Sequence, residues 1–185
     1  MLTRRACIMN KSRKILFAVT GVASLALLAI GCFYLAFSPR TFQGPDDMFS
    51  LRYPRSWQAE TTGGVATFTE RDGPPGETVS VTVVIAKAAA GWAGDFEQAL
   101  SEAFGAIGSG YRFLSKETVR LPGGTANKYA YSVVLEGTRR DNVVYVFPVV
   151  PEKAAVMTCS ASSDRLAALE ATCRDFAASF RLPAP

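Results

Sequence analysis

Cysteine is the residue type in this chain with the most distinctive chemistry. The chain has four cysteines and no histidine. A metal site or a general base would normally use histidine, so its absence removes the commonest partner for a catalytic or zinc-binding thiol. Cys159 and Cys173 lie outside any CxxC spacing, and the 13 residues between them allow a turn and a helix that folds back. The sequence therefore predicts a structural disulfide between Cys159 and Cys173, with a redox or metal pair as the alternative.

The other reactive side chains do not form a recognisable catalytic set. No GxSxG motif is present, and the acids around 70–77 match no EF-hand loop. We therefore predict no catalytic residue, no cofactor and no metal site, and a protein that is not an enzyme. The alternative is a small-ligand binder or a cryptic hydrolase, with a cleft between the sheet and a helix over 95–107.

Two segments of the sequence could contact a protein or lipid partner. Trp92 lies in a small-residue segment before that helix, and Arg139 and Arg140 lie in a predicted charged turn over 137–141. An arginine pair suits an anionic lipid or protein. Trp92, Arg139 and Arg140 are therefore the predicted partner surface, for an envelope protein of unknown identity.

The charge of the chain is divided unevenly. The net charge is +4, but five basic residues precede residue 15, and the part from Ser38 onward has 15 basic and 16 acidic residues. The exported part is thus close to neutral and lacks the basic surface that binds phosphate backbones. We predict no nucleic-acid partner.

The compartment depends on an apolar run. Residues 15–37 contain no charge and are long enough to span a bilayer, and the basic head over 1–14 is predicted to stay in the cytoplasm. In the alternative, Cys32 ends a lipobox-like AIGC segment and is lipidated after cleavage, with translation starting at Met9. Either way the chain is membrane-anchored, and the domain faces the periplasmic or extracytoplasmic side. Residues 38–47 are predicted to be a linker.

Residues 48–185 are predicted to form one exported domain. Alternating apolar residues predict strands over 48–53, 65–70, 79–86, 112–121, 126–135, 142–149 and 154–160. Helical spacing predicts helices over 95–107, with Asp95 as N-cap, and from Ser162 or Ser163 to about Phe180. Trp57, after a turn, is predicted to cover the first strand. The fold class is α+β, an antiparallel sheet of about six or seven strands flanked by helices and preceded by one N-terminal hydrophobic helix.

Two motifs resemble the PsbP-like superfamily. MFSLRYPRSW at 48–57 resembles its F-x-hydrophobic-x-YP-x-x-W opening, and the end through Phe176 and Phe180 resembles its terminal F-x-x-I-x-x-SF segment. The resemblance covers about Phe49 to Arg181 and implies an α/β/α sandwich. It also implies an accessory, assembly or binding role without common catalytic residues, so the expected function is that of a non-catalytic, membrane-tethered envelope domain.

Overall fold

The computed structural model describes residues 38–71, 79–87, 92–106, 110–135, 137–150, 153–162 and 165–183. The chain divides into two compact units, Met1–Ser38 and Pro39–Pro185, and the described strands and helices belong to the second. The basic head, the predicted anchor over 15–37 and Cys32 lie outside the described residues. Within the described residues, no helix combines the length and apolarity that crossing a membrane requires.

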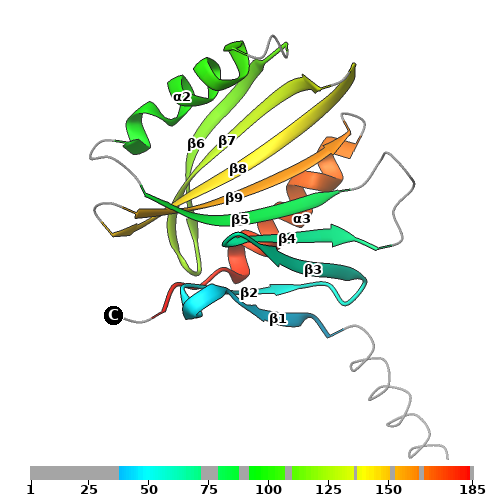
Figure 1. Ribbon diagram of the computed structural model, residues 1–185, viewed down its shortest axis with the longest axis vertical. Coiled ribbons are helices and arrows are strands. Elements are labelled where there is room, and N and C mark those ends of the chain that lie inside the picture. The colour runs from blue at the N-terminus through cyan, green and yellow to red at the C-terminus, as the bar shows by residue number, and fades with distance from the viewer. Residues whose placement is uncertain are drawn as a thin grey trace, which may run out of the picture. The chain divides into compact units, whose positions relative to one another are not determined.

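A seven-stranded antiparallel sheet forms the centre of the second unit (Figure 1). Its strand order is β3-β4-β5-β9-β8-β7-β6. The bounds of its strands are β3 (Trp57–Thr62), β4 (Val65–Glu70), β5 (Ser80–Lys87), β6 (Arg112–Leu121), β7 (Gly124–Leu135), β8 (Thr138–Val150) and β9 (Lys153–Ser162). The chain runs from β5 through helix α2 (Trp92–Ala106) to β6 at the far edge, and returns as a meander until β9 pairs with β5. This architecture confirms the predicted antiparallel sheet, whereas the N-terminal hydrophobic helix of the predicted fold class lies outside the described residues.

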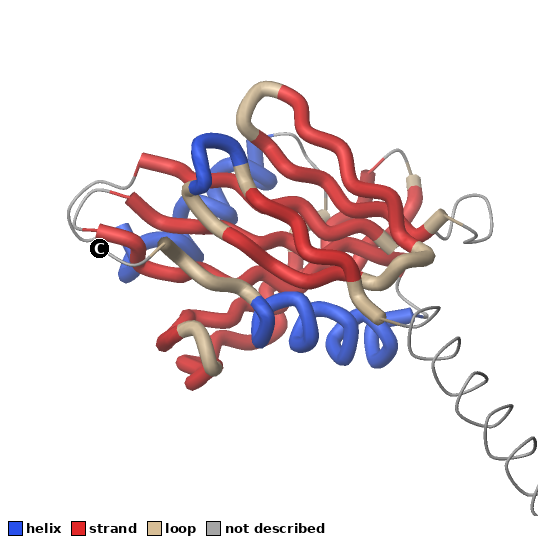
Figure 2. The backbone as a smooth tube through the Cα atoms, turned by 90° about the horizontal axis from the view of Figure 1, so that it is seen from below, coloured by secondary structure: helices blue, strands red, loops and turns tan. Residues whose placement is uncertain are grey.

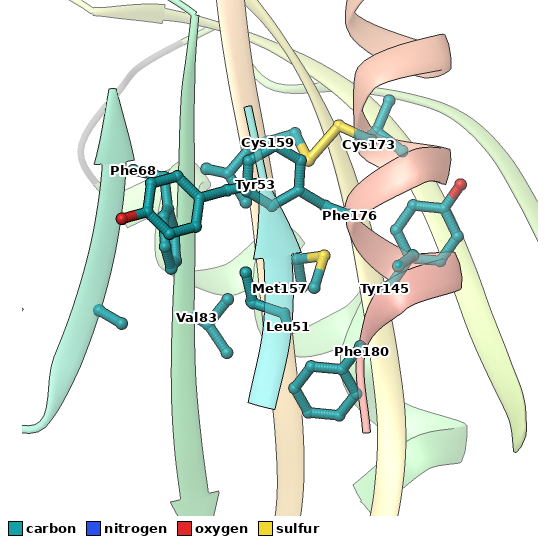
Figure 3. Close-up of a cluster of buried hydrophobic side chains, with 14 of the residues drawn as sticks. Leu51, Tyr53, Phe68, Val83, Tyr145, Met157, Cys159, Cys173, Phe176 and Phe180 are labelled. Atoms are coloured by element: carbon teal, nitrogen blue, oxygen red, sulfur yellow. A yellow bond between two sulfur atoms is a disulfide. The ribbon is translucent and has the colours of Figure 1, made fainter. Parts of the chain in front are cut away.

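Helix α3 (Leu166–Ser179) covers one face of this sheet over β8 and β9 (Figures 1 and 2). Its residues Leu169, Cys173 and Phe176 are buried, as their helical spacing predicted. They pack on the inward side chains of the central strands, among them Val83 and Met157 (Figure 3). Most of the buried aromatic residues that the structure describes gather in this layer: Phe49, Tyr53, Trp57, Phe68, Tyr145, Phe147, Phe176 and Phe180.

Helix α2 packs on the opposite face, over β7. Phe96 and Leu100 of α2 contact a smaller cluster that includes Tyr129, Tyr131 and Val144. Neighbouring β8 residues Val143 and Val144 belong to different clusters because successive side chains of a strand point to opposite faces. The two helices thus lie on opposite faces of the sheet, as an α/β/α sandwich requires.

A two-stranded sheet replaces much of the predicted linker. β1 (Arg40–Gln43) pairs antiparallel with β2 (Ser50–Tyr53), and η1 (Pro45–Asp47) connects them. Ser50 and Arg181 exchange two backbone hydrogen bonds of 2.8 Å, which join β2 to the end of the chain. A side chain at Gly44 would collide with the ring of Phe49, so glycine is required there. Part of 38–47 is therefore a structural element of the domain.

Three predicted boundaries differ from the structure. β3 was not predicted, because four of its six residues are exposed and polar and the strand shows no apolar alternation. Trp57 begins β3 and is buried, as predicted. Helix α2 begins at Trp92, so Asp95 lies inside it and is not its N-cap; Gln98 donates to Glu102 at 2.8 Å instead of forming a capping box. Pro148 does not end β8, which continues through a β-bulge to Val150.

Candidate functional site

The predicted disulfide is present. Cys159 in β9 and Cys173 in α3 are bonded, with an S–S distance of 2.09 Å and a Cα–Cα distance of 6.1 Å. Both residues are fully buried between α3 and the sheet (Figure 3). The bond joins the helix to the central strand next to β5, so its role is to fix α3 on the sheet.

The predicted partner residues belong to two elements, α2 and β8. Trp92 begins α2, but its side chain lies outside the described part of the chain. Arg139 and Arg140 are not in a turn: both are in β8, where consecutive side chains point to opposite faces. Arg139 Nε lies 3.5 Å from Asp141 Oδ1, and the Asp141 side chain is only 2% exposed, although the sequence indicated a solvated charge. The arginine pair therefore does not present a joint surface.

A charged cleft lies on the α3 face of the sheet and is lined by residues of β6, β7, β8 and α3. Its volume is about 330 Å³. The residues that line it come from four elements: Glu117, Val119, Arg120 and Leu121 of β6, Lys128 of β7, Tyr145 of β8 and Arg174 of α3. The cleft predicted from sequence lay beside α2, so this one is on the other face of the sheet.

The hairpin turn between β6 and β7 closes one end of this region. Gly123 lies so close to the backbone carbonyl of Phe180 that any side chain there would collide with it. The guanidinium of Arg181 lies beside the same turn and donates to the carbonyls of Ala178 and Phe180 at 2.8 and 2.7 Å. The turn and the end of α3 therefore meet.

Lys128 connects the hairpin to the helix. Its Nζ lies 2.8 Å from Glu117 on β6 and 3.4 Å from Glu170 on α3, and its side chain is 14% exposed. Burial lowers the pKa of Lys128, but the hydrogen bond to Glu117 and the charges of both carboxylates outweigh burial and raise it. Lys128 is therefore a protonated cation whose charge is matched by two acids.

Tyr145 forms part of the cleft beside this ion cluster. The residue is 3% exposed, and Figure 3 shows its ring next to α3 with the hydroxyl directed away from Leu51 and Met157. Burial raises the pKa of Tyr145, while the nearby positive charges of Lys128 and Arg174 lower it less strongly. At neutral pH the phenol is protonated and can donate a hydrogen bond.

The arrangement suits binding better than bond-making. A lysine with a raised pKa and a tyrosine with a raised pKa both hold their protons, so neither is an activated nucleophile or base. Among the described residues, no group of three or more acidic, cysteine or histidine side chains could hold a metal ion. The cleft offers charge, a hydroxyl donor and an apolar wall formed by Val119 and Leu121.

Sequence reasoning missed this site for a clear reason. Glu117 and Lys128 could have been paired from the sequence, because each is five residues from the Pro122-Gly123 turn of the hairpin. Tyr145 and Arg174 could not, since no local pattern indicates where α3 lies relative to β6 and β7. Those two residues join the cleft only through the tertiary packing.

No protein-family model matches the chain, and no curated protein matches it in sequence. Solved structures do match its fold. The cyanobacterial PsbP (CyanoP) of Synechocystis superposes with a TM-score of 0.55 at 16% identity, over 80% of this chain and 94% of that one. LpqN, involved in cell envelope biogenesis of Mycobacterium tuberculosis, gives a TM-score of 0.55 at 13% identity, over 80% and 86%.

A structure from Bacteroides thetaiotaomicron gives a TM-score of 0.54 at 17% identity over 78% of this chain. This chain spans about half of that protein's length, since 48% of it is covered. The unit Pro39–Pro185 therefore has the PsbP-like fold, which confirms the expectation from the MFSLRYPRSW opening and the terminal segment. At these identities the likeness concerns the fold alone.

Proposed function

We propose that this chain is a non-catalytic binding module, tethered to a membrane and facing the extracytoplasmic side, that acts on or with another envelope component. The observation that carries the proposal is the cleft between α3 and the β6–β7 hairpin. It brings side chains from four elements into one cavity of about 330 Å³, and its lysine and tyrosine are held in their protonated forms. These properties favour recognition over catalysis.

The tether and the compartment follow from the sequence. The apolar run over 15–37, or a lipid on Cys32, supplies the anchor, and the basic head orients it. The Cys159–Cys173 disulfide is compatible with this orientation because such bonds persist in oxidising compartments. A role in the envelope also agrees with the description of LpqN as involved in cell envelope biogenesis.

The test is photo-crosslinking in intact cells. A photoreactive phenylalanine analogue replaces Arg120, which is exposed on edge strand β6 and lines the cleft. The matched control replaces Gln58, which is exposed on β3 at the opposite edge of the same sheet. A third position, Arg139, tests the surface predicted from sequence.

We expect a discrete covalent adduct with an envelope protein from position 120 and none from position 58. Equal adducts from both positions, or none from position 120, would contradict the proposal. An adduct from position 139 alone would move the partner surface to the beginning of β8. Intact-mass measurement of the membrane-extracted chain decides between the spanning helix and a lipid on Cys32.

A second candidate function is small-ligand binding in the same cleft. The volume of the cleft lies at the lower end of the range of ligand pockets, about 300 to 1,000 Å³. In that case position 120 gives no protein adduct, while a small ligand protects Tyr145 and Lys128 from chemical labelling. Such protection would not be expected of a solvated surface.

A further inference from the structure

The cleft contains positive charge that the protein itself does not neutralise. The charge of Lys128 is matched by Glu117 and Glu170. Arg174 is exposed on α3, and neither it nor Arg120 forms an ion pair with any residue that the structure describes. Arg174 nevertheless lies close enough to Tyr145 to lower the pKa of that phenol by its charge. A guanidinium without a carboxylate partner therefore stands beside a hydroxyl donor.

The other residues of the cleft restrict the charge of the ligand and favour an apolar group on it. Glu117 and Glu170 place two negative charges near the same space, and they repel a doubly charged anion more than a singly charged one. Val119 and Leu121 give one wall an apolar surface. Charge and apolar contact are thus available side by side.

We propose that the cleft binds a ligand that carries one singly charged oxyanion next to an apolar group, with Arg174 and Tyr145 as the donors to the oxyanion. A guanidinium binds carboxylate and phosphodiester oxygens through two parallel N–H donors, and the phenol adds a third. The inference rests on the cleft being the binding site of the proposed function. The oxyanion and its apolar neighbour belong either to a free molecule or to a group on a partner.

The experiment uses the full chain in a neutral detergent and follows the amide resonances of Tyr145 and Lys128. N-acetyl-leucine supplies a carboxylate beside an apolar side chain, and N-acetyl-leucinamide is the same molecule without the charge. We expect saturable shifts with the acid and none with the amide. Arg174→Gln should weaken binding about tenfold or more, because a charge-assisted hydrogen-bond pair is lost.

Arg55→Gln is the matched control, because Arg55 is an exposed arginine in the turn before β3 and does not line the cleft. It should bind the acid as the unchanged protein does. Equal shifts with acid and amide, or unchanged affinity in Arg174→Gln, would overturn the inference. Tighter binding of inorganic phosphate than of the singly charged probes would overturn its charge limit.

A second arm identifies the source of the oxyanion. Dibutyl phosphate carries a phosphodiester, as lipid headgroups do, and tighter binding than that of N-acetyl-leucine would identify a phosphodiester. The reverse order would identify a carboxylate. Either order supports the inference.

The two proposals fail in different ways. A specific adduct from position 120 together with unchanged binding in Arg174→Gln would leave the binding module and remove the oxyanion site. Binding of the acid that depends on Arg174, without a protein adduct, would do the opposite and favour the small-ligand function.

Discussion

The two faces of the seven-stranded sheet are packed with different aromatic residues. Under α3, phenylalanine rings dominate, with Phe68 and Phe176 at 5.5 Å between centroids and Phe147 and Phe180 at 4.6 Å. Under α2, tyrosines dominate, with Phe96 against Tyr129 at 4.9 Å and Tyr111 against Tyr131 at 5.6 Å. Among the described residues, 22 buried side chains belong to the first cluster and seven to the second.

The two layers are expected to control different properties: the global stability of the domain and its sensitivity to alkaline pH. The α3 layer joins β1, β2, the central strands and the disulfide, so its loss would unfold the domain as a whole. The α2 layer is small and contains phenols that must stay protonated to remain buried. We therefore expect the α3 layer to set the global stability, and the α2 layer to respond first to alkaline pH and to open locally.

The largest effect should come from Phe176→Ala. Phe176 is 1% exposed and contacts the rings of Trp57 and Phe68, so its removal leaves a cavity in the larger cluster. We expect the free energy of unfolding to fall by about 3 to 5 kcal/mol, measured by urea denaturation. Leu114→Ala is the control, since Leu114 is 37% exposed and its removal should cost less than about 0.5 kcal/mol.

Phe96→Ala on the α2 face is the substitution that corresponds to Phe176→Ala on the α3 face. Phe96 anchors α2, and its loss should release the helix without unfolding the sheet. The cost is then about the burial energy of one ring, 1.5 to 3 kcal/mol. Hydrogen exchange should show faster exchange confined to α2; equal destabilisation by both variants would mean that the two layers unfold together.

Reduction of the disulfide should lower the free energy of unfolding by a similar amount. Cys159 and Cys173 are 14 residues apart in sequence, and closing a loop of that size contributes about 3 kcal/mol on the chain-entropy model. We expect that loss on adding a reductant, measured by urea denaturation. The variant with Cys159→Ala and Cys173→Ala should not respond to the reductant, although Cys7 and Cys32 remain. A response in that variant would assign the effect to the other thiols.

Alkaline pH should act through the α2 layer. Burial raises the pKa of Tyr131 to about 12, whereas the phenol of the unfolded chain ionises near 10. The contribution of Tyr131 is therefore complete below pH 10 and is lost as the pH rises to about 12, by about 2 to 3 kcal/mol. Tyr131→Phe should flatten the fall of Tm over this range, measured by circular dichroism.

Tyr145→Phe tests the other face in the same way. Its pKa is also raised by burial, but Lys128 and Arg174 oppose the shift, so this variant should change the pH profile less than Tyr131→Phe does. A larger effect at Tyr145 would contradict the assignment of alkaline sensitivity to the α2 layer.

Sequence patterns predicted the elements wherever one side of a segment is apolar. Phe49, Leu51 and Tyr53 alternate and are all buried, and Leu169, Cys173 and Phe176 recur at helical spacing and are buried beneath α3. The same reasoning failed where burial is not the cause of the structure. β3 is an edge strand with an exposed polar surface, and its pairing with β4 holds it in place. The predicted turn over 137–141 was wrong because the hairpin turns at Gly137, so Arg139 and Arg140 enter β8.

What the sequence alone determined is local: the periods of two and of three to four residues, the partners of one disulfide and the two end motifs of a PsbP-like domain. These depend on neighbours within one strand or helix. The tertiary structure decided which strands lie side by side and how far α3 reaches across them. Because β9 pairs with β5 and α3 packs over β8 and β9, Lys128, Tyr145 and Arg174 line one cleft, and no local period contains that information.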